Sequence, residues 1–177
     1  PYEFSGSIQQ GILYLSKSYP DFFAQILGLV KAEYFELPVH ANIFTVIKDY
    51  HEKYDQLPND DFILQEIKEL KSSREHVSDY EDELHFINKT DTSAIENPEY
   101  FLDLVESFAR EEAMKSAISD SIVLLKQNKM VEIEDLVKKA LTVSRNVDIG
   151  QTYFNSVLDR WKREIEFSQR DRHSTLL

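Results

Sequence analysis

The sequence predicts an all-α protein: a compact helical bundle, then a long antiparallel helical hairpin, then a C-terminal amphipathic linker helix. Apolar residues recur at spacings of three and four along most of the 177 residues. The chain has only 4 Gly and 5 Pro, which favours helices over a turn-rich β-sandwich, and its 42% hydrophobic residues can form a core. Interruptions of the pattern divide it into residues 1–96 (bundle), 97–148 (hairpin) and 149–177 (linker helix).

The first two helices are predicted over residues 5–18 and from Pro20 onward. Ser5 or Ser7 is expected to cap the first, and Pro20 suits the first turn of the second. Both carry an apolar stripe expected to face the core: Ile8, Ile12, Leu13 and Leu15, then Phe22, Phe23, Ile26, Leu27 and Val30.

The stretch "EYFELPVHANIF" predicts a packed corner. A short turn at residues 33–35 precedes Pro38, which resets the backbone before a helix over residues 39–55. We expect its apolar residues to be buried scaffold: Tyr34, Phe35, Ile43, Phe44 and Ile47. Another helix restarts after Pro58 with Asn59 or Asp60 as its cap, and a more polar helix follows over residues 78–88.

The hairpin begins after the linker "TDTSAIENP". The segment "EYFLDLVESFAREEAMKSAISDSIVLLKQ" keeps a helical pattern without Gly or Pro, "NKM" turns the chain, and "VEIEDLVKKALTVSRNV" returns. A two-helix hairpin cannot bury all of its apolar stripes by itself, so it indicates self-association or docking on a partner. The residues expected at that interface are Ile118, Ile122, Leu125, Ile133, Leu136 and Leu141.

A separate amphipathic helix, "TYFNSVLDRWKREIEFSQRDR", follows the break at Gly150. Two interpretations are open: it docks on another subunit, or it folds back as a last core helix. The expected docking residues are Val157, Leu158, Trp161 and Ile165.

The charge is strongly negative and unevenly placed. The net charge is −12, and residues 75–112 hold 12 acidic residues against two basic ones, Lys89 and Arg110. Such a segment repels a phosphate backbone, so strong direct DNA binding is not expected; the other interpretation is an acidic solvent-facing surface. The absence of Cys and of a long apolar run predicts a cytoplasmic protein with no membrane partner.

No pattern of catalytic or cofactor-binding residues is present. None of the four glycines stands in a GxxxxGK[ST] or GxGxxG frame, so no nucleotide site is expected. "HEKYD", from His51 to Asp55, begins like HExxH, but its fifth residue is Asp, so no metal site is expected. We therefore expect no catalytic, cofactor-binding or metal residue in this chain.

The order of motifs resembles the N-terminal region of DnaB-type replicative DNA helicases, closest to the versions encoded by phages. The motifs are "AEYFELPVHANIF", "LPNDDFILQEI", "NPEYFLDLVESFAREEAM", "ALTVSRNV" and "VLDRW". The family's "Y…IV…R" pattern is matched by Tyr100, Leu104, Val105 and Arg110. The chain is more acidic than the bacterial members and lacks their paired small residues in the first helix.

The resemblance implies a non-catalytic collar of an ATP-dependent helicase. Collars of that family pair through their hairpins, from dimer to hexamer ring, and bind primase or a helicase loader, while the linker helix hooks onto the neighbouring motor domain. ATP and Mg would belong to a motor expected beyond "RHSTLL", and a phage protein would work in the bacterial cytoplasm. The alternative is a stand-alone helicase loader, adaptor or acidic DNA mimic.

Overall fold

The computed structural model describes residues 2–70, 77–90, 97–144 and 163. Within these ranges the chain forms seven α-helices, one short 3₁₀ helix and no strand, which confirms the predicted all-α class. The elements are α1 (Tyr2–Ser18), α2 (Pro20–Ile26), η1 (Ala32–Tyr34), α3 (Pro38–Tyr54), α4 (Asp60–Leu70), α5 (Val77–Asn88), α6 (Pro98–Lys126) and α7 (Met130–Leu141).

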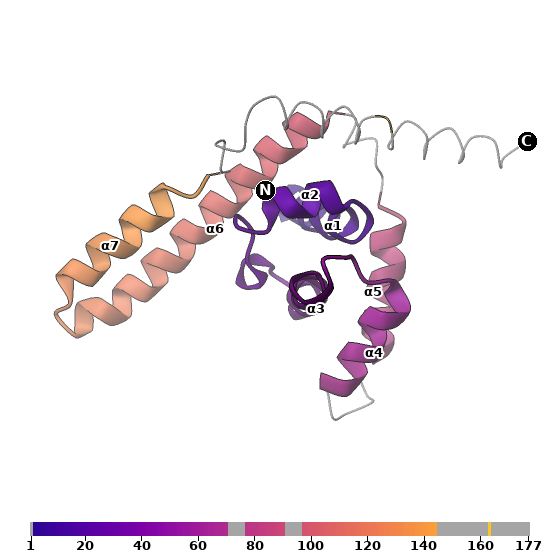
Figure 1. Cartoon of the computed structure of the whole chain (residues 1–177). Helices are drawn as coiled ribbons and strands as arrows, with labels where there is room; N and C mark the ends of the chain where they lie inside the picture. The colour runs from indigo at the N-terminus through magenta and orange to yellow at the C-terminus, as the bar shows by residue number, and fades with distance from the viewer. Residues whose placement is uncertain (1, 71–76, 91–96, 145–162, 164–177) are drawn as a thin grey trace, which may run out of the picture.

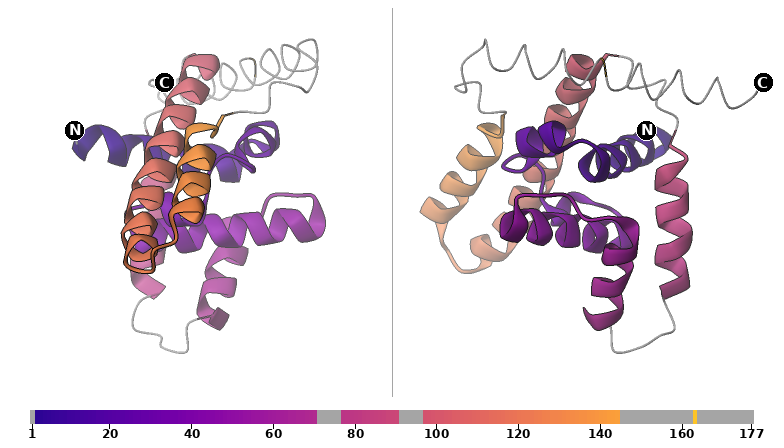
Figure 2. Two further views of the ribbon diagram at one scale, coloured as in Figure 1. Left: turned by 90° about the vertical axis from the view of Figure 1, so that its left-hand side faces the viewer. Right: turned by 45° about the vertical axis from the view of Figure 1, so that its right-hand side comes forward.

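The helices form a bundle from which a hairpin extends. Figure 1 shows α1 to α5 gathered on one side, with α6 passing along them and continuing outward together with α7. The right-hand view of Figure 2 agrees, because there the far end of the α6–α7 hairpin projects away from the remaining helices. The core crosses the predicted boundary between residues 96 and 97, since Phe101, Leu102 and Val105 of α6 belong to it.

Helix α1 lies at the centre of the bundle and is buried on more sides than its apolar stripe predicts. Besides the apolar residues, Gln9 and Ser16 are also buried. Gln9 is satisfied in part by the corner, because its Oε1 accepts a hydrogen bond from the backbone N–H of Glu36 at 3.0 Å. The predicted caps of this helix are wrong: α1 already begins at Tyr2, so Ser5 and Ser7 lie within it.

Gly11 lets α1 approach α6 closely. A Cβ at this position would lie 2.8 Å from Cζ of Phe101, well inside van der Waals contact. The Phe101 ring is itself buried, and its centroid lies 6.1 Å from that of Phe22 on α2. The sequence therefore has its smallest residue where two helices meet around an aromatic ring.

The corner between α2 and α3 forms as predicted. Pro20 and Pro38 occupy the first turns of α2 and α3, where a missing N–H costs no helical hydrogen bond. All five predicted scaffold residues are buried: Tyr34, Phe35, Ile43, Phe44 and Ile47. Phe44 joins the two sides, since its ring centroid lies 5.9 Å from Phe23 and 5.2 Å from Phe35.

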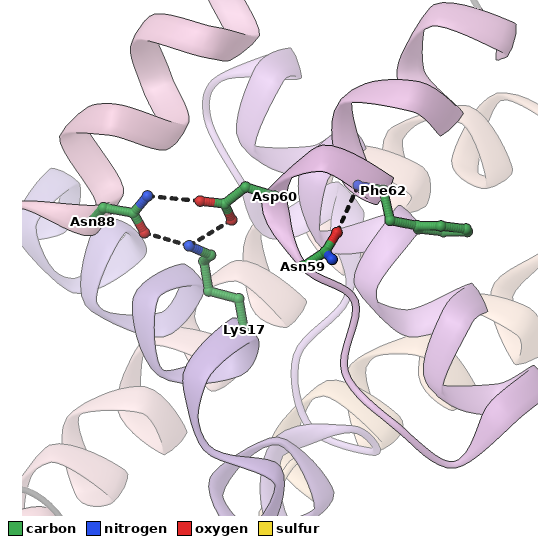
Figure 3. Close-up of polar contacts among 5 residues, drawn as sticks. All are labelled: Lys17, Asn59, Asp60, Phe62 and Asn88. Atoms are coloured by element: carbon green, nitrogen blue, oxygen red, sulfur yellow. Dashed lines mark hydrogen bonds and ion pairs between the residues drawn. The ribbon is translucent and has the colours of Figure 1, made fainter.

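Polar contacts at two places help to attach α4 and α5 to this centre. His40 of α3 is buried, and its Nε2 lies 2.7 Å from Oε1 of Glu83 on α5. At the opposite end of α5, Lys17, Asp60 and Asn88 join three helix ends, with Lys17 Nζ 2.7 Å from Asp60 Oδ1 (Figure 3).

The predicted cap of α4 is present. Oδ1 of Asn59 accepts a hydrogen bond from the backbone N–H of Phe62 at 2.8 Å, also drawn in Figure 3.

The close approach at Gly11 predicts opposite outcomes for two alanine substitutions in α1. Gly11→Ala should lower the free energy of unfolding by about 1 kcal/mol, because overpacking against a confined ring outweighs the gain in helix propensity. Gly6→Ala is the matched control: no neighbouring atom lies within 4 Å of its added Cβ, so it should gain up to about 1 kcal/mol. Urea unfolding measures both, and equal stabilisation by both would contradict this account.

Candidate association surface on the helical hairpin

Helix α6 runs from the bundle to the far end of the hairpin. Asn97 caps it, since its Oδ1 accepts a hydrogen bond from the backbone N–H of Tyr100 at 3.2 Å, and Pro98 follows in the first turn. The helix then continues for 29 residues to Lys126. The cap marks where α6 begins. The helix is long enough that its far half, together with α7, extends beyond α1 to α5 (Figure 1).

The buried face of α6 changes character along its length. Large side chains come first, with Phe101, Leu102, Val105 and Phe108 in the core. Ala109, Ala113 and Ala117 follow at four-residue spacing on one face, and all three are buried. Buried Ala140 of α7 belongs to the same cluster, so small side chains line the approach of α7 to α6. Beyond Ala117, α6 has no buried residue.

The turn between the two arms is closed by backbone hydrogen bonds. The N–H of Asn128 donates to the carbonyl of Leu125, and that of Lys129 donates to the carbonyl of Leu124, both at 3.1 Å. Asn128 has a left-handed backbone with φ of 57°, which Asn tolerates better than most residues other than Gly. The predicted "NKM" turn is thus the tip of the hairpin.

The other end of α7 is attached to the middle of α6 by Arg110. Its Nε–H donates to the carbonyl of Val143 at 3.2 Å, and its Nη2 lies 2.8 Å from Oε1 of Glu106, one turn earlier on α6. Val143 and Leu136 are half-buried and pack against the core cluster. The hairpin is therefore held at its tip by a turn and at its base by a guanidinium.

Four of the six residues predicted for the interface are strongly exposed. Ile118, Ile122, Leu125 and Leu141 are 55–61% exposed. The other two, Ile133 and Leu136, are half-buried. The first three stand at spacings of four and three, so they share one face of α6.

Three further exposed apolar residues were not predicted: Val123, Met130 and Val131. We call these seven residues the tip surface: Ile118, Ile122, Val123, Leu125, Met130, Val131 and Leu141. They are seven of the eleven large hydrophobic side chains that are exposed in the described part of the chain, so exposed apolar area concentrates on the hairpin. Six of them lie in the distal half of α6 or the first turn of α7, and Leu141 lies at the C-terminal end of α7. The signal that could have found them is their position next to the predicted turn.

Charge is distributed differently on the two halves of the hairpin. Residues 97–113 carry five acidic residues and one basic residue. Residues 114–144 carry five lysines and four acidic residues, a net charge of +1 in a chain of −12. At the junction, hydrogen bonds to Glu112 and Glu111 raise the pKa of Lys115 above its usual value, although partial burial opposes this. The tip surface thus lies in a nearly neutral part of an acidic protein.

A cleft of about 390 Å³ separates α7 from the bundle. Its walls are the segment around Gly28 and Leu29 on one side and α6 and α7, including Ala117, Leu136 and Ala140, on the other. The charged side chains that line it are of both signs: Lys31, Glu33, Asp120 and Lys139. The cleft thus lies between part of α7 and the bundle.

The predicted docking residues of the linker helix, Val157, Leu158, Trp161 and Ile165, lie outside the described residues.

Among the residues that are described, no three His, Asp or Glu side chains are placed to share a metal ion. The described helices also include none with the length and apolar character needed to cross a membrane.

No family model matches the chain, and no curated protein matches it.

The left-handed residue at the tip predicts a graded response to substitution. Asn128→Gly should keep or slightly raise stability, because Gly adopts this backbone without steric cost. Asn128→Val should lower it by about 1–2 kcal/mol, because a β-branched side chain clashes in the left-handed region. Urea unfolding compares the two, and equal stability of both variants would show that the turn does not constrain the hairpin.

Proposed function

We propose that this chain is an assembly domain that pairs with a second copy of itself through the tip surface. The observation that carries the proposal is the concentration of exposed apolar side chains on the distal hairpin, where no described element of the same chain covers them. Burying such residues is favourable by about 25 cal/mol per Å² of apolar area. Clustering of exposed large apolar side chains on one element is typical of protein–protein contact sites.

The charge distribution favours a second copy as the partner. Two chains of net charge −12 repel each other when their acidic faces meet. Pairing through residues 114–144 brings together segments of net charge +1 and keeps the acidic residues of 75–112 away from the contact. Charges of both signs on the same surface also suit a self-complementary contact.

The resemblance extends the proposal to a larger protein. On that basis the chain is the N-terminal collar of a hexameric ATP-dependent replicative DNA helicase, which forms a ring and docks a primase or a helicase loader. The linker helix with Trp161 would then engage a neighbouring motor domain. The acidic segment also keeps open a second candidate, a stand-alone loader, adaptor or DNA mimic.

Charged substitutions on the tip surface should separate the copies. Ile122→Lys combined with Leu125→Lys should weaken self-association of the chain at least tenfold, because the contact would have to bury two new like charges. Both side chains are more than half exposed, so the fold itself should change in stability by no more than about 0.5 kcal/mol. Sedimentation over a concentration series and circular dichroism measure the two effects.

Phe86→Lys provides the matched control. Phe86 is 61% exposed but lies on α5, away from the hairpin, so this variant should associate as the natural chain does. A natural chain that stays monomeric at high concentration, or a Phe86→Lys variant that dissociates as much as the double variant, would overturn the proposal.

The reading frame downstream of codon 177 separates the two candidates. A helicase collar predicts that the frame continues into a GxxxxGK[ST] motif within several dozen codons, because the motor needs a phosphate-binding loop. A stop codon directly after Leu177 would decide for the stand-alone adaptor. Sequencing of the genomic locus is sufficient.

A further inference from the structure

Helix α7 is held in place mainly by one neighbour, α6, and buries little of its own surface. It has 12 residues, a length at which an isolated helix is marginal in water, and its one fully buried residue is Ala140. Within the described structure, α6 is the helix against which α7 makes extensive contact. An element with so little burial belongs to the part of a protein that opens most easily.

The cleft removes the other support that α7 could have. Leu136 and Ala140 face it from α7, while Gly28 and Leu29 form part of its opposite wall. The bundle and α7 therefore line opposite walls of the cleft. The docking of α7 depends on its contact with α6.

Arg110 makes a polar bridge between the middle of α6 and the segment that follows α7. Its Nε–H reaches the carbonyl of Val143, two residues beyond the last residue of α7. Carbonyl groups at a helix C-terminus lack intrahelical donors and carry partial negative charge, so a guanidinium suits this place. Glu106 holds the guanidinium from the other side at 2.8 Å.

We propose that Arg110 is the positioning residue that keeps α7 docked on α6. The tip surface has residues on both helices, with Met130, Val131 and Leu141 on α7 and the others on α6. Docking of α7 keeps these two parts together, so Arg110 controls whether the tip surface is complete. The evidence that Arg110 bridges the two segments is its contacts with Val143 and Glu106, which do not depend on the proposed function. The effect of Arg110 on self-association rests on the proposed function.

The test is hydrogen exchange, followed by mass spectrometry, of the full 177-residue chain and its Arg110→Ala variant. Loss of a charge-assisted hydrogen bond at a half-exposed site should accelerate exchange of the α7 amides about fivefold. Exchange in α3, which lies in the bundle, should stay unchanged and shows that the variant folds. Arg110→Lys should restore protection only in part, because an ammonium lacks the planar fork that serves Glu106 and Val143 together.

Lys115→Ala is the matched control. Lys115 is a cation on the same helix, but its contacts are with Glu111 and Glu112 of α6 itself, so its removal should leave α7 exchange unchanged. If Arg110→Ala does not accelerate α7 exchange, or if Lys115→Ala accelerates it equally, the inference is wrong.

Sedimentation of the Arg110→Ala variant measures the consequence for pairing, which should weaken at least threefold. A natural chain that does not self-associate would overturn the proposed function. The hydrogen-exchange result would still show whether Arg110 keeps α7 docked on α6.

Discussion

The run of Ala109, Ala113 and Ala117 on α6 is the constraint on which the rest of the structure depends. Before it, large side chains hold α6 in the bundle; along it, small side chains let α7 come close. Close approach of two backbones replaces the bulky interdigitation that holds the other helices together. After Ala117 the bundle no longer covers α6, and α7 is its main described neighbour there. Ile118, Ile122, Val123 and Leu125 are exposed in this half of the helix. The same helix is thus a core element at one end and an association element at the other.

Much of this architecture could be predicted from the sequence, because periodic apolar residues and proline positions determine where helices begin and face. The corner around Phe44 and the helix after Asn59 followed from local signals of this kind. The burial of Gln9 and His40 could not be predicted, because each depends on a partner far along the chain, Glu36 and Glu83. The role of the alanines was also missed, because alanine adds little to an apolar stripe. On the hairpin, the exposed state of Val123, Met130 and Val131 depends on how far α6 extends beyond the bundle, which no local pattern encodes.

The distribution of charge gives the functional proposal its direction. The functional proposal rests on contact surfaces and not on a catalytic motif. Acidic residues crowd the segment from 75 to 112, whereas the distal hairpin balances lysines against carboxylates. An apolar surface in a neutral setting favours association, while the acidic segment favours basic partners or none. The two kinds of surface lie at different places on the fold and can serve different contacts.

The joint of Lys17, Asp60 and Asn88 has a consequence for how the fold is specified. Apolar helix faces tolerate small sliding and rotation, since one leucine or isoleucine contact resembles the next. A lysine whose side chain is only 9% exposed does not tolerate such shifts, because moving any of the three helix ends leaves a shielded charge without its partners. The joint therefore specifies how α1, α4 and α5 are aligned with one another, where apolar packing alone would accept several alignments. Its effect is on the choice of alignment more than on net stability.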